Sequence, residues 1–258
     1  MASSGAEEPR TLLRTLPWQD RFVLLSGLGL VTLLAWIYLL DMANGMKAMS
    51  MGTSWTAAYG ASMLLMWIIM MVGMMVPSAI PMILIHAAVA RKAAREGATL
   101  ASTGIFIAGY VVIWSLFSVA ATVAQWALDR AALLSPMMTS NSARLGGILV
   151  CAAGLYQLTP MKAVCLRHCR APVHFLSRHW RPGAVGALRM GFEHGLYCLG
   201  CCWILMGLLF VGGVMSIWWI GGLALFVLAE KVLPQGGLGG RILGLAATAW
   251  GVTLLISG

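Results

Sequence analysis

Long apolar runs set the strongest limit on how this chain folds. Seven of them lie at about 22–40, 58–80, 103–127, 143–159, 189–211, 214–231 and 242–257. A helix needs roughly 20 apolar residues to cross the hydrocarbon core of a bilayer, and most of these runs come close to that length. Because lipid offers the backbone no hydrogen-bond partners, each run is expected to be a helix. The sequence therefore predicts an all-α polytopic membrane protein with about seven transmembrane helices.

The positions of the basic residues predict how the chain is oriented in the membrane. Only 10% of residues are charged, against about a quarter in a soluble domain, and the net charge is +9. Fourteen Lys and Arg residues fall on one set of alternate connections, and three (Lys47, Arg130 and Arg144) on the other. Since basic loops stay in the cytoplasm, the N-terminus is expected inside and the C-terminus outside. The positive charge is thereby explained without a nucleic-acid partner.

The chain divides into a short tail and one membrane domain. Residues 1–21 are expected to form a cytoplasmic tail, and residues 22–258 a single transmembrane domain with a cytoplasmic Cys/His-containing loop at about 160–188. The first apolar run is too long for a signal peptide and is expected to be a retained anchor. Pro77 and Pro81 predict a kink or an unwound stretch after the second run.

Methionines gather in the first third of the chain. Eleven of the 18 lie between residues 42 and 82. Met42, Met46, Met49 and Met51 are expected in a short outer loop. Met63, Met66, Met70 and Met74 fall within about 80° of one helix face, a group we call the methionine stripe. Methionine commonly fills gaps in cores, but its thioether is also a soft ligand that selects Cu(I).

The stretch "MGFEHGLYCLGCCWILMGLLF" (190–210) places ligand-type side chains inside an apolar run. Met190, His194, Cys198 and Cys201 share an arc of about 80°, and Cys202 lies about 40° further round. His194 and Cys201 are about 10 Å apart along the axis, too far for one ion to bind both. Either another helix completes the site, or ions step between sites. Polar groups within a membrane span are candidates for function by default, although Cys also packs as a small apolar residue.

Two further groups lie near the predicted inner surface. Cys165, His168 and Cys169 occupy one face of a turn in a basic segment, which is either a ligand group or an amphipathic anchor at the inner leaflet. The spacing is not that of a zinc finger. Glu230 and Lys231 are expected to form a local ion pair or a snorkelling cap, with a role near the site as the alternative.

These residues lie in motifs that resemble a bacterial family of predicted metal-binding integral membrane proteins of unknown function. The matching motifs are "MWIIMMVGMMVPSAIPM", "YQLTPMKAVCLRHCRAP", "GALRMGFEHGLYCLGCCWILMGLLF" and "EKVLPQG". The resemblance covers most of residues 60–236. It implies a helical membrane fold and metal binding at Cys165, Cys169, His194, Cys198, Cys201 and Cys202. It also implies a small companion protein as a candidate partner.

Together these features predict a protein of the bacterial inner membrane that binds Cu(I) for transport or delivery. Copper would pass from the outer methionine loop along the methionine stripe, with Met66, Met70 and Met74, to His194, Cys198 and Cys201, and then to Cys165 and Cys169. Zinc is the second candidate metal, and no enzymatic activity is expected. One alternative is a membrane thiol oxidoreductase that uses Cys198 and Cys201. Another is a non-catalytic subunit of a larger complex, with Trp218 and Trp219 as interface anchors.

Overall fold

The computed structural model describes residues 16–48, 55–135, 138–233 and 236–257. In chain order the helices are α2 (Trp18–Ala48), α3 (Ala57–Arg95), α4 (Thr103–Arg130), α5 (Ala143–Gln157), α6 (Pro160–Arg170), α7 (Pro172–His179), α8 (Gly183–Gly207), α9 (Leu209–Gly212), α10 (Ile217–Val232) and α11 (Gly236–Ser257). Apart from an isolated bridge between Leu134 and Ser140, the described residues form helices and their connections. This confirms the all-α prediction.

Five or six of the described helices are long and apolar enough to cross a membrane. α2, α3, α4 and α11 qualify, as does α8 together with α9. α5 and α6 form a sixth candidate, bent by 65°. α10 has 16 residues, so it is about 24 Å long and shorter than a hydrocarbon core of about 30 Å. The count of seven spans and the orientation therefore stay predictions.

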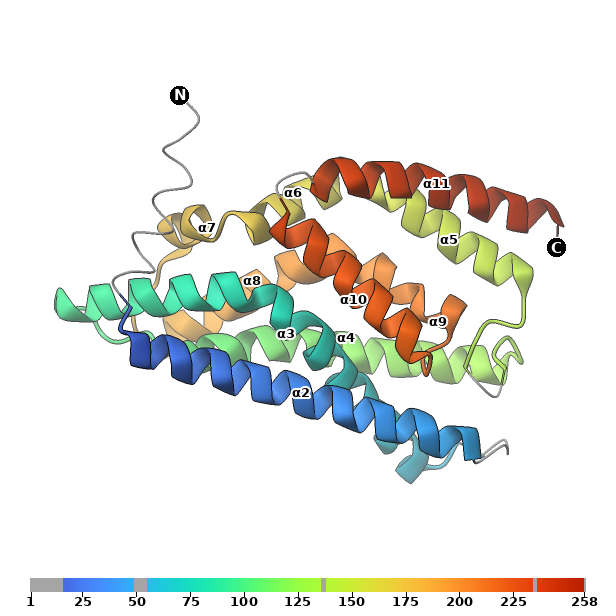
Figure 1. Cartoon of the computed structure of the whole chain (residues 1–258), viewed down its shortest axis with the longest axis horizontal. Helices are drawn as coiled ribbons and strands as arrows, with labels where there is room; N and C mark the ends of the chain where they lie inside the picture. The colour runs from blue at the N-terminus through green and yellow to red at the C-terminus, as the bar shows by residue number, and fades with distance from the viewer. Residues whose placement is uncertain (1–15, 49–54, 136–137, 234–235, 258) are drawn as a thin grey trace.

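The long helices run back and forth beside one another, as Figure 1 shows. α2 lies along one edge, and α5 and α11 pack together at the opposite edge. Between them, α3 contacts α2, α4 and α10, while α4 packs against α8. An ion pair between Asp20 and Arg91 joins the start of α2 to the end of α3. We call this the basic end. At the far end, the Trp55 indole donates a hydrogen bond of 2.7 Å to Asp129.

α3 is the central helix and contains much of the core. It remains helical through Pro77 and Pro81 and extends to Arg95, although Figure 1 shows that it changes direction along its length. The prolines therefore accompany a kinked helix without an unwound stretch. Each proline lacks one backbone donor, and such a loss is the usual cause of a kink.

One expectation about the connections is wrong. α2 continues to Ala48, so Met42 and Met46 belong to a helix, whereas a short loop was expected. Met49 and Met51 lie outside the described residues. The segment at 160–188, predicted to be a cytoplasmic connection, contains two short helices, α6 and α7. Thr159 caps α6, and Pro160 occupies its first turn. α6 packs against α8, and α7 packs against α3, which brings the Cys165–Cys169 turn to the core.

Candidate metal centre

Four cysteines from two helices meet in the core, level with the middle of α3. Cys198, Cys201 and Cys202 of α8 are buried, and Cys169 of α6 packs against the same cluster of core residues. The Cys169 side chain is within hydrogen-bond reach of Cys198 and Cys201, and Cys202 is within reach of Cys198. We call these four residues the cysteine cluster. α6 thus adds a thiol from a second helix, which is one of the two arrangements that the spacing on α8 left open.

The hydrogen bonds of the cluster show how its sulfurs are held. The thiols of Cys201 and Cys202 donate to the backbone carbonyl of Cys198, at 3.0 and 3.1 Å. This carbonyl is one turn back along α8, so the two side chains fold toward Cys198. All six cysteines of the chain are free thiols. The sulfurs are therefore available as soft donors.

Cys198 has two further partners from other helices. The Lys231 amino group of α10 donates to its sulfur at 2.9 Å and to the Ser78 hydroxyl of α3 at 2.9 Å. The Tyr110 hydroxyl of α4 lies 3.0 Å from the same sulfur and donates to the carbonyl of Met75 at 3.1 Å. Each of these groups is buried. Side chains of α4 and α10 therefore meet at the Cys198 sulfur of α8, and each of them is also bonded to α3.

His194 lies beside this centre but faces aromatic rings. Its ring is 5.6 Å from that of Tyr110, 6.1 Å from Phe106 and 5.6 Å from Phe175. The side chain is 3% exposed, and its Nδ1 atom has no hydrogen-bond partner among the described residues. A buried ring nitrogen without a partner is uncommon and is free to accept a ligand.

The other predicted ligands are placed differently. Cys165 packs closely against Gly200 of α8, where an added Cβ would come within 2.8 Å of the cysteine sulfur. This puts Cys165 at the border of the cysteine cluster. His168 points elsewhere: its ring stacks on Tyr197 at 4.1 Å, and its Nδ1 atom lies 2.9 Å from the carbonyl of Val164. The structure therefore does not bring His168 to the cysteine sulfurs.

The methionine stripe is buried, as its spacing predicts. Met63, Met66, Met70 and Met74 are all 2% exposed or less, and they share one core cluster with Cys198. α3 meets Cys198 near Met75, through Tyr110. This contact lies about 8 Å further along α3 than Met70 at 1.5 Å per residue. The stripe therefore ends close to the cysteine cluster.

The expected ion pair between Glu230 and Lys231 is wrong. Glu230 pairs with Lys162 of α6 at 2.7 Å, and both side chains are buried. Consecutive residues on a helix point about 100° apart, so Lys231 faces the cysteine cluster and Glu230 faces α6. The alternative expectation, that this pair of residues lies near the site, describes Lys231 correctly.

The donor set fits a soft ion that needs few ligands. Within the described residues, no three His, Cys, Asp or Glu side chains are arranged to hold a metal ion together. A tetrahedral zinc site requires four such ligands. Cu(I) is satisfied by two sulfurs, and thiolates select it. The cysteine cluster supplies neighbouring thiols of this kind.

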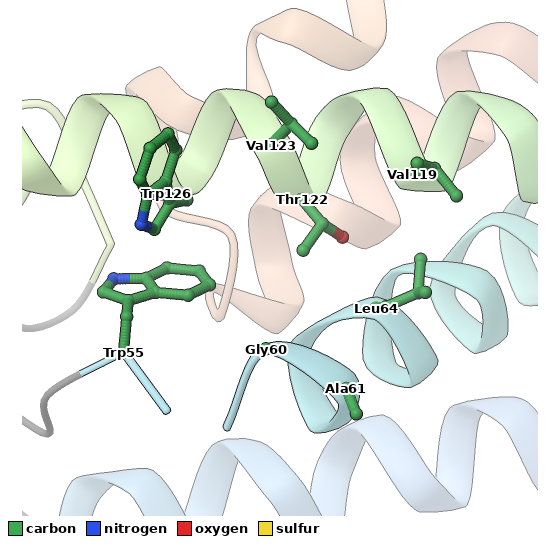
Figure 2. Close-up of a pocket in the computed structure, with 8 residues that line it drawn as sticks. All are labelled: Trp55, Gly60, Ala61, Leu64, Val119, Thr122, Val123 and Trp126. Carbon is green, nitrogen blue, oxygen red and sulfur yellow. The ribbon is translucent and has the colours of Figure 1, made fainter. Parts of the chain in front are cut away.

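A cavity at the far end lacks these features. It lies between the start of α3 and the end of α4, and Figure 2 shows the rings of Trp55 and Trp126 on either side of its mouth. Its other lining residues are Gly60, Ala61, Leu64, Val119, Thr122 and Val123. None of these is a soft donor. The cysteine cluster is therefore the better candidate for metal chemistry.

Sequence reasoning missed Tyr110 and Ser78, because neither lies in a pattern of ligand-type residues. A tyrosine in an apolar run and a serine between two prolines were the available signals, since polar groups in a span usually have partners.

The comparisons identify a family. No curated protein and no solved structure matches the chain significantly. A family model described as "PpoB2: Copper chaperone" matches residues 64–254, which include the methionine stripe from Met66 onward and all of the cysteine cluster. A match over this much of the chain supports a copper-related function, and the chain belongs to the PpoB2 copper chaperone family.

Proposed function

We propose that this protein binds Cu(I) as cargo on the cysteine cluster and delivers it across or from the inner membrane of a bacterium. The observation that carries the proposal is the meeting of three buried thiols of α8 with the partly exposed thiol of Cys169 on α6. Family membership supports copper as the metal. Thiolates are soft donors, and they select Cu(I) over harder ions.

The charge of Lys231 supports an anionic copper complex at this position. Two thiolates and one Cu(I) ion carry a net charge of −1, which is costly to bury without a partner. The Lys231 amino group already lies 2.9 Å from the sulfur of Cys198. A buried cation at this distance compensates the charge of the loaded site, while the aromatic rings around His194 keep water away.

The methionine stripe supports a route to the cluster. Thioethers bind Cu(I) without carrying charge, so they hold the ion more weakly than thiolates and allow it to move on. Met66, Met70 and Met74 lie along one buried face that leads toward Tyr110 and Cys198. A small companion protein that accepts the ion near α6, where Cys165 and Cys169 are partly exposed, completes the proposed pathway.

Copper content tests the assignment. The protein is purified under reducing conditions and loaded with Cu(I), and bound copper is compared with that of a variant carrying Cys198→Ser, Cys201→Ser and Cys202→Ser. We expect the variant to lose at least one tightly bound ion per chain. Cys151→Ser is the matched control, because Cys151 lies on α5 with its thiol near Thr248 of α11, away from the cluster. Equal copper in all three proteins would refute the site.

The same preparations test the redox alternative. A thiol oxidoreductase would form and reduce a disulfide between Cys198 and Cys201 in metal-free buffer, with a defined midpoint potential. We expect no such reversible couple. A disulfide that cycles in the absence of copper would overturn the proposal in favour of the oxidoreductase.

The route has its own test. Replacing Met66, Met70 and Met74 together by Leu keeps the volume and apolar character of the core, because Leu and Met are close in size. We expect the variant to fold and to keep its thiol-bound copper when Cu(I) is supplied in detergent. In cells, its copper loading should fall several-fold. Unchanged loading in cells would show that copper does not follow the stripe.

A further inference from the structure

A second group of sulfurs lies at the far end of the molecule, away from the cysteine cluster. The side-chain amide nitrogen of Gln125, on α4, lies 3.1 Å from the sulfur of Met138 and 3.5 Å from the sulfur of Met63. Met63 is the first residue of the methionine stripe, and Met138 lies in the α4–α5 connection. All three side chains are buried. Two thioethers from distant parts of the chain therefore face one point.

The orientation of the Gln125 amide is fixed by Trp67. The indole N–H of Trp67 donates to the amide oxygen of Gln125 at 2.6 Å. An indole nitrogen is only a donor, so the atom it contacts must be the oxygen, and the NH₂ group must face the two sulfurs. The partial positive charge of that NH₂ group occupies the position that a cation between the sulfurs would take.

The backbone of Met138 is unusual in a way that serves this arrangement. Its φ angle is +56°, in the left-handed region that residues with a side chain rarely adopt. The amide of Met138 donates to the carbonyl of Ser135 at 2.8 Å, and the carbonyl of Met138 accepts from Val214 at 3.4 Å. The connection is thus held in a strained conformation that directs the Met138 side chain inward, and such strain concentrates at functional positions.

Packing alone does not account for these features. A methionine that only fills a gap needs neither a left-handed backbone nor a polar partner, because its flexible side chain adapts to the space. Burying the Gln125 amide among apolar helices is costly unless its groups are paired, and sulfur is a weak acceptor. A leucine at position 125 would avoid this cost.

We infer that Met63 and Met138 form a thioether site for Cu(I), with the Gln125 amide holding the two sulfurs apart until the ion enters. This inference rests on the proposed function, and it makes the pair the loading site at the start of the methionine stripe. Asp129, one turn beyond Gln125, is exposed at the same end, where it accepts a hydrogen bond from the Trp55 indole.

The geometry requires only a local movement. The two sulfurs are at most 6.6 Å apart, the sum of their distances to the amide nitrogen. A metal–sulfur bond is about 2.3 Å long, so an ion shared by two sulfurs needs them about 4.6 Å apart or closer. Rotation of the Gln125 amide away from the pair, together with a change in the flexible methionine side chains, closes that gap. The ion takes the place of the amide hydrogens, and the rotation also breaks the hydrogen bond from the Trp67 indole to the Gln125 oxygen.

Methyl resonances of methionine test the site directly. The full-length protein in detergent, with ¹³C-labelled methionine methyl groups, is titrated with Cu(I), which is diamagnetic. Single Met→Leu variants assign the signals. We expect the Met63 and Met138 signals to shift together and to saturate at one ion. In Met63→Leu, the Met138 signal should no longer shift, and the reverse should hold in Met138→Leu. Met82→Leu, a buried change further along α3, is the control that should leave both shifts intact.

Two outcomes separate this site from the cysteine cluster. The titration is repeated in the variant that carries Ser at Cys198, Cys201 and Cys202. Shifts of Met63 and Met138 that persist there support the thioether site, even if the wild-type protein has no thiol-bound copper and the proposed function fails. If the wild-type protein loads its thiols while the signals of Met63 and Met138 stay unmoved, the thioether site is refuted and the proposed function stands.

Discussion

Lys231 is a buried cation with no carboxylate partner in the described part of the chain. Its amino group instead contacts the sulfur of Cys198 and the hydroxyl of Ser78. The neighbouring carboxylate of Glu230 forms an ion pair with Lys162. An isolated charge is costly in a low-dielectric interior, so a compensating negative charge is expected close by. A thiolate at Cys198, free or bound to Cu(I), is the group in position to supply it.

Replacing Lys231 tests this role. In Lys231→Met, the loaded site loses its compensating charge, and we expect the affinity for Cu(I) to fall about tenfold or more, since each tenfold change corresponds to about 1.4 kcal/mol. Lys231→Arg keeps the charge and should retain most of the affinity. Competition with a chromophoric Cu(I) chelator gives both values. If Lys231→Met binds as tightly as the wild type, the amino group is only a structural partner of Ser78.

The local pattern of the sequence predicted the ligand-type residues but not their partners. Spacing on one helix was enough to place Cys198, Cys201 and Cys202 together, because residues three and four apart share a face. The contact with Lys231 depends on how α10 crosses α8, and no local pattern encodes that crossing. The contact of Met138 with Gln125 depends on the left-handed backbone of Met138 after α4, which has no sequence signature.

At the level of helices, α5 and α11 form a closely packed pair. The Cβ of a residue at Gly154 would come within 2.6 Å of the carbonyl of Gly244 and of the amide of Thr248. At Gly251 it would come within 2.7 Å of the amide of Cys151. Small residues let membrane helices approach this closely, and the contact then gains van der Waals and weak hydrogen-bond energy. The close approach of α5 and α11 thus depends on glycine at these positions, because a side chain there would push the helices apart.

A single methyl group should separate this pair. In Gly154→Ala, the added Cβ meets backbone atoms that cannot move aside, and overpacking of this kind costs about 1–3 kcal/mol. We expect a lower melting temperature in detergent. Copper binding at the cysteine cluster should be unchanged in protein that gel filtration shows to be free of aggregates. Gly222→Ala in α10 is the matched control, because nothing lies within 4 Å of its added Cβ. Equal melting temperatures would show that the pair tolerates wider spacing.

Hydropathy predicts the positions of the long helices but not how they bend or pack. Apolar runs located the long helices well, and the end of the run at 143–159 matches α5 to within two residues. They could not show that α5 bends by 65° into α6, or that the basic segment folds back onto α8. Both features follow from tertiary contacts, such as the buried ion pair between Lys162 and Glu230.

Across the whole molecule, two kinds of sulfur occupy different levels. Met63 and Met138 lie near the start of α3 and the end of α4, whereas Cys198 lies level with the middle of α3, where Lys231 contacts both its sulfur and Ser78. Neutral thioethers near one end and thiols at mid-depth give a gradient of affinity for Cu(I). Under the orientation predicted from the basic residues, this gradient runs inward from the outer surface. The direction of delivery therefore depends on the topology of the chain.

Reporter fusions determine that topology. We expect a phosphatase that is active only outside the cytoplasm to be active when fused after residue 258, and inactive when fused after residue 235. A fluorescent protein that matures only in the cytoplasm should show the reverse. A fusion in the connection after Glu96 is the internal control, because three basic residues precede it and place it inside. If α10 does not cross the membrane, the fusions at 235 and 258 exchange sides while the control stays unchanged, and the count of seven spans is wrong.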